Sequence, residues 1–377
     1  MKIGVITFHR SENYGSALQA VAMSVVLKRL GYEPVFLDYI CDADYKQYKL
    51  FRTYLYKDNI RSIVADIVYL KKNYERKKNF QKFIDNNLVL SNKLSDGTSE
   101  EQWNRISEMF DCFICGSDQI WNPRCFNEFN GHYFLDFTEP RKKIAYAPSF
   151  GNTEGLTEKE KKMLAEYLKG FYYLSVREKS ASDFLKREFQ REDVQTVLDP
   201  TMLLTKKEIE TICKKVNIKK YIFVYIIGNI TDYRKEMKII YEFAKMRGLK
   251  IIYSAKKTTQ DLKNAERLYS FGPDEFLGYI QFAEYVFSNS FHATVFSILM
   301  KKNFQTIARR GTNSRIADLL KLCELEDRFF AAGDIDNEID YIRIEEKIAG
   351  AKKKSLEFLQ TALNNMQDAI IGEDVLK

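Results

Sequence analysis

The sequence predicts an α/β protein with two domains, each built on a parallel sheet that helices cover on both faces. Short apolar runs recur between helical patterns, which is typical of strands buried on both faces of a parallel sheet. A length of 377 residues also exceeds that of a usual single domain. The first series of runs ends at Asp199-Pro200, and a second begins near Tyr221. We therefore expect an N-terminal domain over residues 1–205 and a C-terminal domain over residues 206–377.

The first domain is expected to begin with a strand, a polar loop and an amphipathic helix. The apolar run over residues 2–8 predicts the strand, and the helical pattern continues to Leu30. Gly31 is expected to end this helix, because helix C-termini favour glycine. Further strands of the first domain are predicted at residues 34–39, 112–117, 143–150, 172–178 and 195–199.

The second domain repeats this arrangement on a smaller scale. Residues 355–371 carry a long helical pattern and predict a C-terminal helix. The strands of the second domain are predicted at residues 221–228, 250–255, 285–289 and 304–309.

Residues 42–100 interrupt the alternation and predict a helical, basic insertion in the first domain. Between Lys46 and Lys82 the chain holds eleven Lys or Arg against three Asp or Glu, a net charge of +8. Since the whole chain carries +7, the remaining residues sum to about −1, and the basic character is local to this segment. Such a segment is either a solvated pair of helices or a surface that meets anionic lipid head groups or a diphosphate-bearing acceptor. Aromatic residues lie among these charges: Tyr48, Phe51, Tyr54, Tyr56, Tyr69, Tyr74 and Phe80.

Composition and missing motifs argue against several classes of protein. Scattered cysteines, six in all, and the lack of an apolar run of about 18 residues predict a cytoplasmic chain without a disulfide framework. Three widely separated histidines make a histidine metal site improbable. The sequence has no G-x-G-x-x-G after its first strand, no P-loop and no G-x-S-x-G elbow. The modest net charge gives no reason to expect nucleic acid as a partner.

Polar loops follow five of the predicted strands, where ligands bind in open α/β sheets. These loops carry Arg177 and His292, and His292 lies where a strand hands over to a helix. A helix start presents free N–H groups and the positive end of the helix dipole, so it binds anions. The loops together predict a site for a phosphorylated ligand. They read HRSENYGSA, GSDQIWNP, PSFGN, VREKSAS and SNSFHAT.

Each of these residues also has a purely structural interpretation. Arg177 can pair with a nearby carboxylate such as Glu178 or Asp183, and Asp118 can cap a helix. His292 can simply satisfy a backbone carbonyl. The glycines at 15, 116 and 151 can be ordinary turn residues.

At these loops the chain resembles the polysaccharide pyruvyl transferase family. The resemblance runs from about residue 3 to residue 330, leaving out the basic insertion and the C-terminal tail. It implies two Rossmann-like domains facing a cleft, as in GT-B glycosyltransferases, with the acceptor on the N-terminal side and phosphoenolpyruvate on the C-terminal side. The most specific combination of motifs is NYGSALQA, GSDQIWNP and SFHATVFSI.

The resemblance implies transfer of pyruvate from phosphoenolpyruvate to two hydroxyls of a sugar, forming a ketal and releasing phosphate. It implies neither a metal nor another cofactor. The acceptor would belong to a polysaccharide or its lipid-linked precursor, and the enzyme would work in the cytoplasm or at the inner face of the membrane. Phosphoenolpyruvate has two anionic groups, and the planar fork of arginine suits both. Its methylene carbon must be protonated during the reaction, a task for which histidine is well suited.

The family pattern for phosphoenolpyruvate is an Arg-x-His element, which aligns with Ser290, Phe291 and His292. His292 is therefore the expected acid, whereas serine replaces the arginine. Arg177 matches a second arginine of the family, and the missing charge is expected from Arg309, Arg310 or Arg315. The residues expected to contact the sugar acceptor are Asn13, Tyr14, Gly15, Gly116, Ser117 and Asp118.

Two other functions fit the same architecture. One is a GT-B glycosyltransferase that uses a nucleotide sugar, although no clear acidic pattern for gripping a ribose is found in the second domain. The other is a non-catalytic relative that binds a sugar or an anion, for which Ser290 is a small hint.

Overall fold

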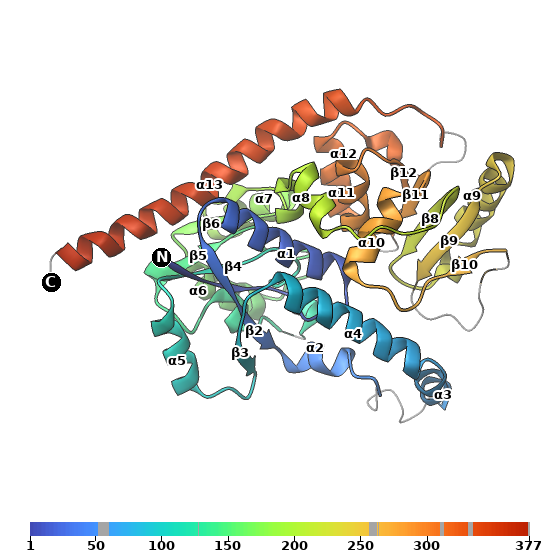
Figure 1. Ribbon diagram of the computed structural model, residues 1–377. Coiled ribbons are helices and arrows are strands. Elements are labelled where there is room, and N and C mark those ends of the chain that lie inside the picture. The colour runs from blue at the N-terminus through green and yellow to red at the C-terminus, as the bar shows by residue number, and fades with distance from the viewer. Residues whose placement is uncertain are drawn as a thin grey trace. The chain divides into compact units, whose positions relative to one another are not determined.

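The computed structural model divides the chain into two compact α/β units (Figure 1). The first unit comprises Met1–Lys71, Phe80–Leu204 and Gly350–Lys377, and the second comprises Lys72–Asn79 and Thr205–Ala349. The residues that the structure describes are 1–51, 60–126, 128–255, 262, 264–309, 313–330 and 335–375.

The first unit contains a parallel seven-stranded sheet. The strands are β1 (Lys2–Ile6), β2 (Glu33–Ile40), β3 (Leu90–Ser95), β4 (Cys112–Cys115), β5 (Lys143–Ala145), β6 (Tyr173–Val176) and β7 (Gln195–Thr196). Their order is β3-β2-β1-β4-β5-β6-β7, and all neighbouring strands are parallel. The central strands β1 and β4 are almost entirely buried, which explains why they read as continuous apolar runs.

Helices cover both faces of this sheet. One face packs against α5 (Glu100–Met109), α6 (Glu158–Lys169) and α7 (Lys179–Phe189) in a single apolar cluster. Capping boxes start α5 and α6, with Ser99 and Thr157 as the N-caps. Two further helices, α1 (Tyr14–Arg29) and the C-terminal helix α13 (Tyr341–Val375), are hydrogen-bonded to the end of the short turn Pro200–Leu203. Arg29 of α1 donates to the Leu203 carbonyl, and Lys352 of α13 donates to the Leu204 carbonyl.

The first helix is buried on nearly all sides, so the predicted amphipathic pattern was wrong for it. Its buried residues run without interruption from Tyr14 to Ser24, and Val26 and Leu27 are buried as well. Part of the reason is the turn Pro200–Leu203, which lies against α1 and accepts a hydrogen bond of 3.2 Å from Arg29 through the Leu203 carbonyl. The end of the helix agrees with the prediction, because Leu30 is its C-cap and Gly31 follows with a φ of 89°.

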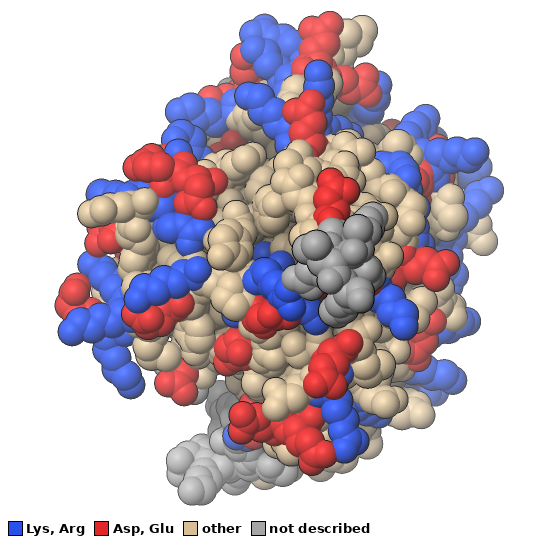
Figure 2. Space-filling model, turned by 90° about the vertical axis from the view of Figure 1, so that its left-hand side faces the viewer, with Lys and Arg blue, Asp and Glu red and all other residues tan. Residues whose placement is uncertain are grey.

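The predicted helical insertion is helical only in part. It contains α2 (Asp42–Gln47), α3 (Ile60–Val68) and α4 (Leu70–Asn87), whereas Leu90–Ser95 forms the edge strand β3. The prediction failed at β3 because tertiary pairing with β2 overrides a weak local pattern. Tyr54 and Tyr56 lie outside the described residues. On the face of the molecule drawn in Figure 2, both signs of charge are interspersed.

The second unit contains a parallel five-stranded sheet in the order β10-β9-β8-β11-β12. The two-residue strand β10 had not been predicted. The strands are β8 (Tyr221–Ile226), β9 (Lys250–Ala255), β10 (Glu266–Arg267), β11 (Tyr285–Ser288) and β12 (Asn303–Thr306). The helices are α8 (Lys206–Ile212), α9 (Arg234–Arg247), α10 (Pro273–Gln281), α11 (Phe291–Leu299) and α12 (Ser314–Leu322).

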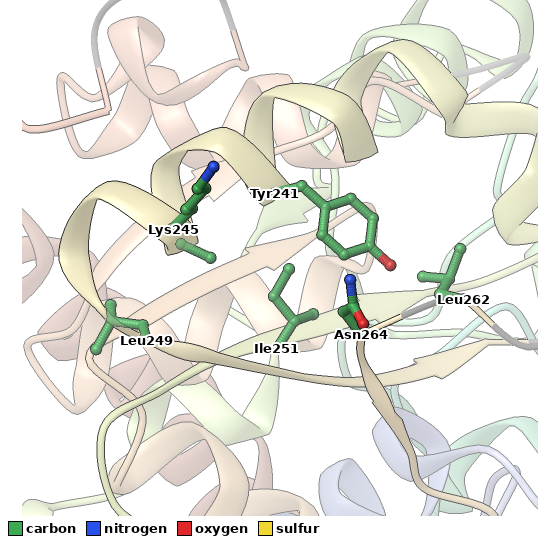
Figure 3. A pocket seen from close by; sticks show the side chains of 7 residues that line it. Tyr241, Lys245, Leu249, Ile251, Leu262 and Asn264 are labelled. Atoms are coloured by element: carbon green, nitrogen blue, oxygen red, sulfur yellow. The ribbon is translucent and has the colours of Figure 1, made fainter.

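An open groove of about 570 Å³ lies between α9 and β9 (Figure 3). Tyr241 and Lys245 line it from the helix, and Ile251 lines it from the strand. None of the residues that line it was predicted as a site residue, so it does not help to locate the predicted site.

Two helices contribute residues to both units. In α13, the residues from Gly350 onward group with the first unit, although the sequence had placed them in the second domain. The Leu198 backbone N–H donates to Ser355 Oγ at 2.9 Å, and the Tyr146 ring lies 6.3 Å from that of Phe358. In α4, residues 72–79 group with the second unit. The first unit otherwise ends at Leu204, next to the predicted boundary.

Candidate functional site

Each sheet has one point at which the strand order reverses, and ligands of open α/β sheets bind at such points. In the first sheet the reversal lies between β1 and β4, and in the second it lies between β8 and β11. The loops that leave the carboxyl ends of these four strands carry most of the predicted site residues.

At the first reversal point, α1 begins beside the loop that follows β4. Asn13 is the N-cap of α1, and its Oδ1 accepts a hydrogen bond from the Gly15 N–H at 3.0 Å. Ser16 donates to the Asp118 carboxylate and so joins the helix to that loop. Tyr14 is buried, and its ring lies 5.0 Å from Phe80. The structure therefore brings together Asn13, Gly15 and Asp118, but it commits the Tyr14 ring to packing.

The loop after β4 approaches β1 closely. A Cβ on Gly116 would lie 3.1 Å from the Thr7 Cβ, so a larger side chain there would crowd β1. Thr7 Oγ1 donates to the Ser117 carbonyl at 2.7 Å, and Ser117 Oγ donates to Asp199 at 2.6 Å. Asp118 has a φ of 76°, and backbone strain of this kind is held only where the surrounding contacts fix it. Asp118 caps no helix, since its carboxylate accepts from Ser16 and from the Gln119 N–H.

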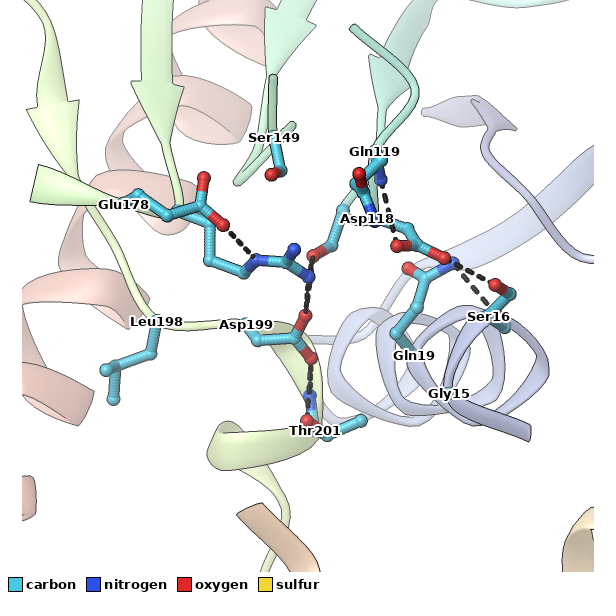
Figure 4. Close-up of polar contacts among 12 residues, drawn as sticks. Gly15, Ser16, Gln19, Asp118, Gln119, Ser149, Glu178, Leu198, Asp199 and Thr201 are labelled. Carbon is cyan, nitrogen blue, oxygen red and sulfur yellow. Dashed lines mark hydrogen bonds and ion pairs between the residues drawn. The ribbon is translucent and has the colours of Figure 1, made fainter. Parts of the chain in front are cut away.

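Arg177 lies inside a buried ion-pair network, and Figure 4 labels its two carboxylate partners, Glu178 and Asp199. Its Nε lies 2.9 Å from Glu178 Oε1, and its Nη1 lies 2.8 Å from Asp199 Oδ2. Burial lowers the pKa of Arg177, but the Glu178 and Asp199 carboxylates outweigh burial and raise it above its usual value. The side chain is only 3% exposed. The geometry thus favours the alternative in which Arg177 pairs with Glu178; Asp183 instead pairs with Lys179.

A second buried network was missed by sequence reasoning. His9 Nδ1 lies 3.0 Å from the Thr7 carbonyl oxygen, and His9 Nε2 lies 3.2 Å from Asp38 Oδ1. Arg10 donates to both oxygens of Asp38, from Nε to Oδ1 at 2.7 Å and from Nη2 to Oδ2 at 2.8 Å. Burial raises the pKa of Asp38, but hydrogen bonds from His9 and Arg10 outweigh it and hold the pKa well below its usual range. The only signal in the sequence was the pair His9-Arg10 just after one strand and an aspartate within the next.

At the second reversal point, Asn289 ties the ends of two strands together. Its Oδ1 accepts from the Ile227 N–H at 2.7 Å, and its Nδ2 donates to the Ile227 carbonyl at 3.1 Å. The same amide nitrogen donates to the Tyr233 hydroxyl at 2.9 Å. One step earlier, Ser288 Oγ donates to the Tyr225 carbonyl at 2.6 Å. These bonds fix the backbone from which Ser290 and His292 project.

His292 is the second residue of α11, so it lies at a helix start as the sequence suggested. Ser290 is the N-cap, and its Oγ accepts from the Ala293 N–H at 3.4 Å. His292 is buried, and the Phe291 ring meets it edge-on with the centroids 5.2 Å apart. The imidazole therefore lies near the positive end of a helix dipole, where an anionic ligand is favoured.

The loop after β12 reaches the same edge of the sheet, because β12 is parallel to β11. Arg309 is exposed, and its backbone is held by Asn313, whose Oδ1 accepts from the Arg309 N–H at 2.7 Å. Arg315 is the second residue of α12. Arg310 lies outside the described residues. Arg309 thus lies on the loop that leaves the carboxyl end of β12, next in the sheet to the strand that leads to His292.

No group of three or more His, Cys, Asp or Glu side chains that could hold a metal occurs among the residues the structure describes. Within the same part of the chain, none of the helices combines the length and the apolar character that crossing a bilayer requires.

Comparison with solved structures shows which fold this is. The UDP-GlcNAc 2-epimerase of Methanocaldococcus jannaschii is 12% identical, with a TM-score of 0.53 over 93% of this chain and 92% of that one. MnaA of S. aureus, solved with UDP, is 11% identical, with a TM-score of 0.54 over 96% and 97%. An alpha-glucosyltransferase solved with UDP and a 13-mer DNA is 11% identical, with a TM-score of 0.50 over 98% and 99%. These neighbours confirm the predicted GT-B-like fold.

At such identities the likeness shows the fold alone, because one fold carries many functions. No curated protein matches this chain. The model of a protein family, polysaccharide pyruvyl transferase, matches residues 13–310. The match includes the start of α1, the loop after β4, the Arg177 network and the start of α11 at His292. Since it spans most of the chain and both reversal points, this chain belongs to the polysaccharide pyruvyl transferase family.

Proposed function

We propose that this protein transfers pyruvate from phosphoenolpyruvate to two hydroxyls of a sugar in a polysaccharide or in its lipid-linked precursor. Family membership supports polysaccharide pyruvyl transfer in general. The observation that carries the finer proposal is the position of His292, buried at the start of α11 and beside the carboxyl ends of β8 and β11.

The reaction has two bond-forming steps. A sugar hydroxyl attacks C2 of phosphoenolpyruvate while the methylene carbon C3 takes a proton and becomes a methyl group. A second hydroxyl then replaces the phosphate at C2, which closes the ketal and releases inorganic phosphate. His292 would supply the proton to C3, as a general acid that acts near neutral pH.

In this proposal the second unit binds phosphoenolpyruvate and the first unit binds the sugar. The start of α11 and Arg309 offer N–H groups and a cation to the phosphate and carboxylate. Asn13, Gly15, Gly116, Ser117 and Asp118 gather at the reversal point of the first sheet and offer hydrogen-bonding groups suited to a sugar. Arg177 would hold that loop in place rather than touch the phosphate.

A phosphate-release assay tests the proposal. The protein is incubated with phosphoenolpyruvate and a panel of acceptors that end in galactose, mannose or glucosamine. We expect phosphate release that depends on one of these acceptors, together with a methyl resonance of the new ketal in the NMR spectrum of the product. Release of phosphate without any sugar product would contradict the proposal.

Transfer of a sugar from a nucleotide sugar is the second candidate, because an alpha-glucosyltransferase solved with UDP shares the fold. The same acceptor panel with UDP-sugars, read as UDP release, separates the two reactions. A non-catalytic relative would bind phosphoenolpyruvate or sugar and turn over neither donor.

A further inference from the structure

Helix α4 brings part of the basic insertion to the carboxyl edge of the second sheet. Residues 72–79 of α4 group with the second unit. They are hydrogen-bonded to the loop that follows β10. Ser270 Oγ donates to the Lys72 carbonyl at 2.9 Å, and Asn79 Nδ2 donates to the Ser270 carbonyl at 2.9 Å. The Lys72 ammonium also lies 3.7 Å from the centroid of the Tyr269 ring. This stretch of α4 is therefore fixed at both ends on the second unit.

Arg76 lies on the same face of α4 as these two anchors. It is four residues after Lys72 and three before Asn79, and residues at these spacings share one face of a helix. Arg76 is half-buried, whereas Lys77 and Lys78, which follow it, are exposed. The face that carries Arg76 is therefore the one that packs on the second unit.

Two contacts lead from this face of α4 to the buried Tyr225. Asn79 lies against Gly272, the N-cap of α10, and the Phe276 ring of α10 lies 5.0 Å from that of Tyr225. Tyr225 lies near the end of β8 and is the register partner of Ser288 in β11. Burial raises the pKa of the Tyr225 hydroxyl to about 12, while the charges of Arg76 and Arg309 act to lower it. Two guanidinium groups from distant parts of the sequence thus act on one point at the reversal of the strand order. Ser290 lies two residues beyond Ser288.

We propose that Arg76 is a phosphoenolpyruvate-binding residue that replaces the arginine absent at Ser290. Arg76 and Arg309 would together supply the two cations that the phosphate and the carboxylate require. The basic insertion would then serve the donor site through one residue of α4. This inference rests on the proposed function, because it assigns the ligand from that reaction.

Isothermal titration with phosphoenolpyruvate tests the inference on wild type and on Arg76→Ala, Arg76→Gln and Arg76→Lys. The matched controls are Lys77→Ala and Lys78→Ala, which remove the same charge from the exposed face of the same helix. We expect affinity to fall about ten- to a hundredfold in the Ala and Gln variants, since a charge-assisted hydrogen bond is lost. The affinity of the Lys variant should lie between that of these variants and that of wild type, because lysine keeps the charge but lacks the planar guanidinium group that binds bidentately. Both controls should bind like wild type.

The outcomes separate the two claims. If wild type does not bind phosphoenolpyruvate, the proposed function fails and the inference fails with it. If wild type binds but Arg76→Ala and Arg76→Gln match the lysine controls, only the inference is overturned. Thermal unfolding is recorded for every variant. A loss of binding that always accompanies a loss of folded protein would assign Arg76 a structural role and overturn the inference as well.

Discussion

Arg177 Nη1 lies 2.8 Å from Asp199 Oδ2, and both side chains are almost completely excluded from solvent. The same carboxylate accepts from Ser117, and its other oxygen accepts from the Thr201 N–H and hydroxyl (Figure 4). This pair therefore joins the ends of β4 and β6 to the turn that lies against α1.

Removal of Arg177 should destabilise the fold. We expect Arg177→Ala to lower the free energy of unfolding by about 3–5 kcal/mol, because it leaves the Glu178 and Asp199 carboxylates buried without their cation. Urea unfolding followed by circular dichroism measures the change. Arg187→Ala is the control, since Arg187 is exposed and pairs at the surface with Glu188. A folded Arg177→Ala protein of wild-type stability that fails to bind phosphoenolpyruvate would instead restore Arg177 as a ligand.

Removal of His292 should abolish most turnover. General acid–base groups contribute about 10²–10⁴-fold to rate, so His292→Ala and His292→Gln should lose phosphate release by a factor in this range. The Gln variant keeps most of the side-chain volume in a buried position, so it should remain folded. His132→Gln is the control, because His132 stacks on Trp103 in the first unit at a centroid distance of 4.3 Å. Wild-type phosphate release by a folded His292→Gln protein would remove His292 from the mechanism.

The Asp38 network predicts a pH-dependent stability. The folded-state pKa of Asp38 lies below its usual value, so its contribution is complete above the unfolded pKa of about 4 and is lost as pH falls toward the folded value. Asp38→Asn should therefore cost more at pH 7 than at pH 3, by about 1 kcal/mol, because pH 3 lies about one unit below the unfolded pKa. Urea unfolding at both pH values checks this, with the exposed Asp183→Asn as control. An equal cost of Asp38→Asn at both pH values would mean that its charge contributes nothing.

The remaining exposed lysines of α4 test the membrane proposal. Lys72 and Arg76 belong to the face that packs on the second unit, whereas Lys71, Lys77 and Lys78 are exposed and make no contact named above. Basic residues near an anionic membrane contribute about 1 kcal/mol each, so we expect weak sedimentation with anionic vesicles at low salt. It should disappear in 1 M salt, where the Debye length is about 3 Å, and in a Lys71→Gln, Lys77→Gln, Lys78→Gln variant. If wild type ignores anionic vesicles at low salt, the acceptor is not reached through this patch.

The sequence by itself determined the class of fold and the location of the polar loops. Strands such as Tyr221–Ile226 are buried on both faces, so local composition reveals them without knowledge of their neighbours. The position of His292 at a helix start could be predicted for the same reason, because a strand, a serine N-cap and an apolar helix are consecutive in the chain. The family resemblance rested on these same local stretches, and the family model confirmed it.

Only the tertiary structure decided which distant groups meet. Arg177 binds an aspartate 22 residues away in the chain, and Asp38 binds a histidine and an arginine that follow another strand. The short strand β3, the grouping of α13 with the first unit and the docking of α4 on the second depend on contacts with residues far away in the chain. Such contacts are set by packing and by the pairing of buried charges across long sequence separations, and no local pattern of residues specifies them.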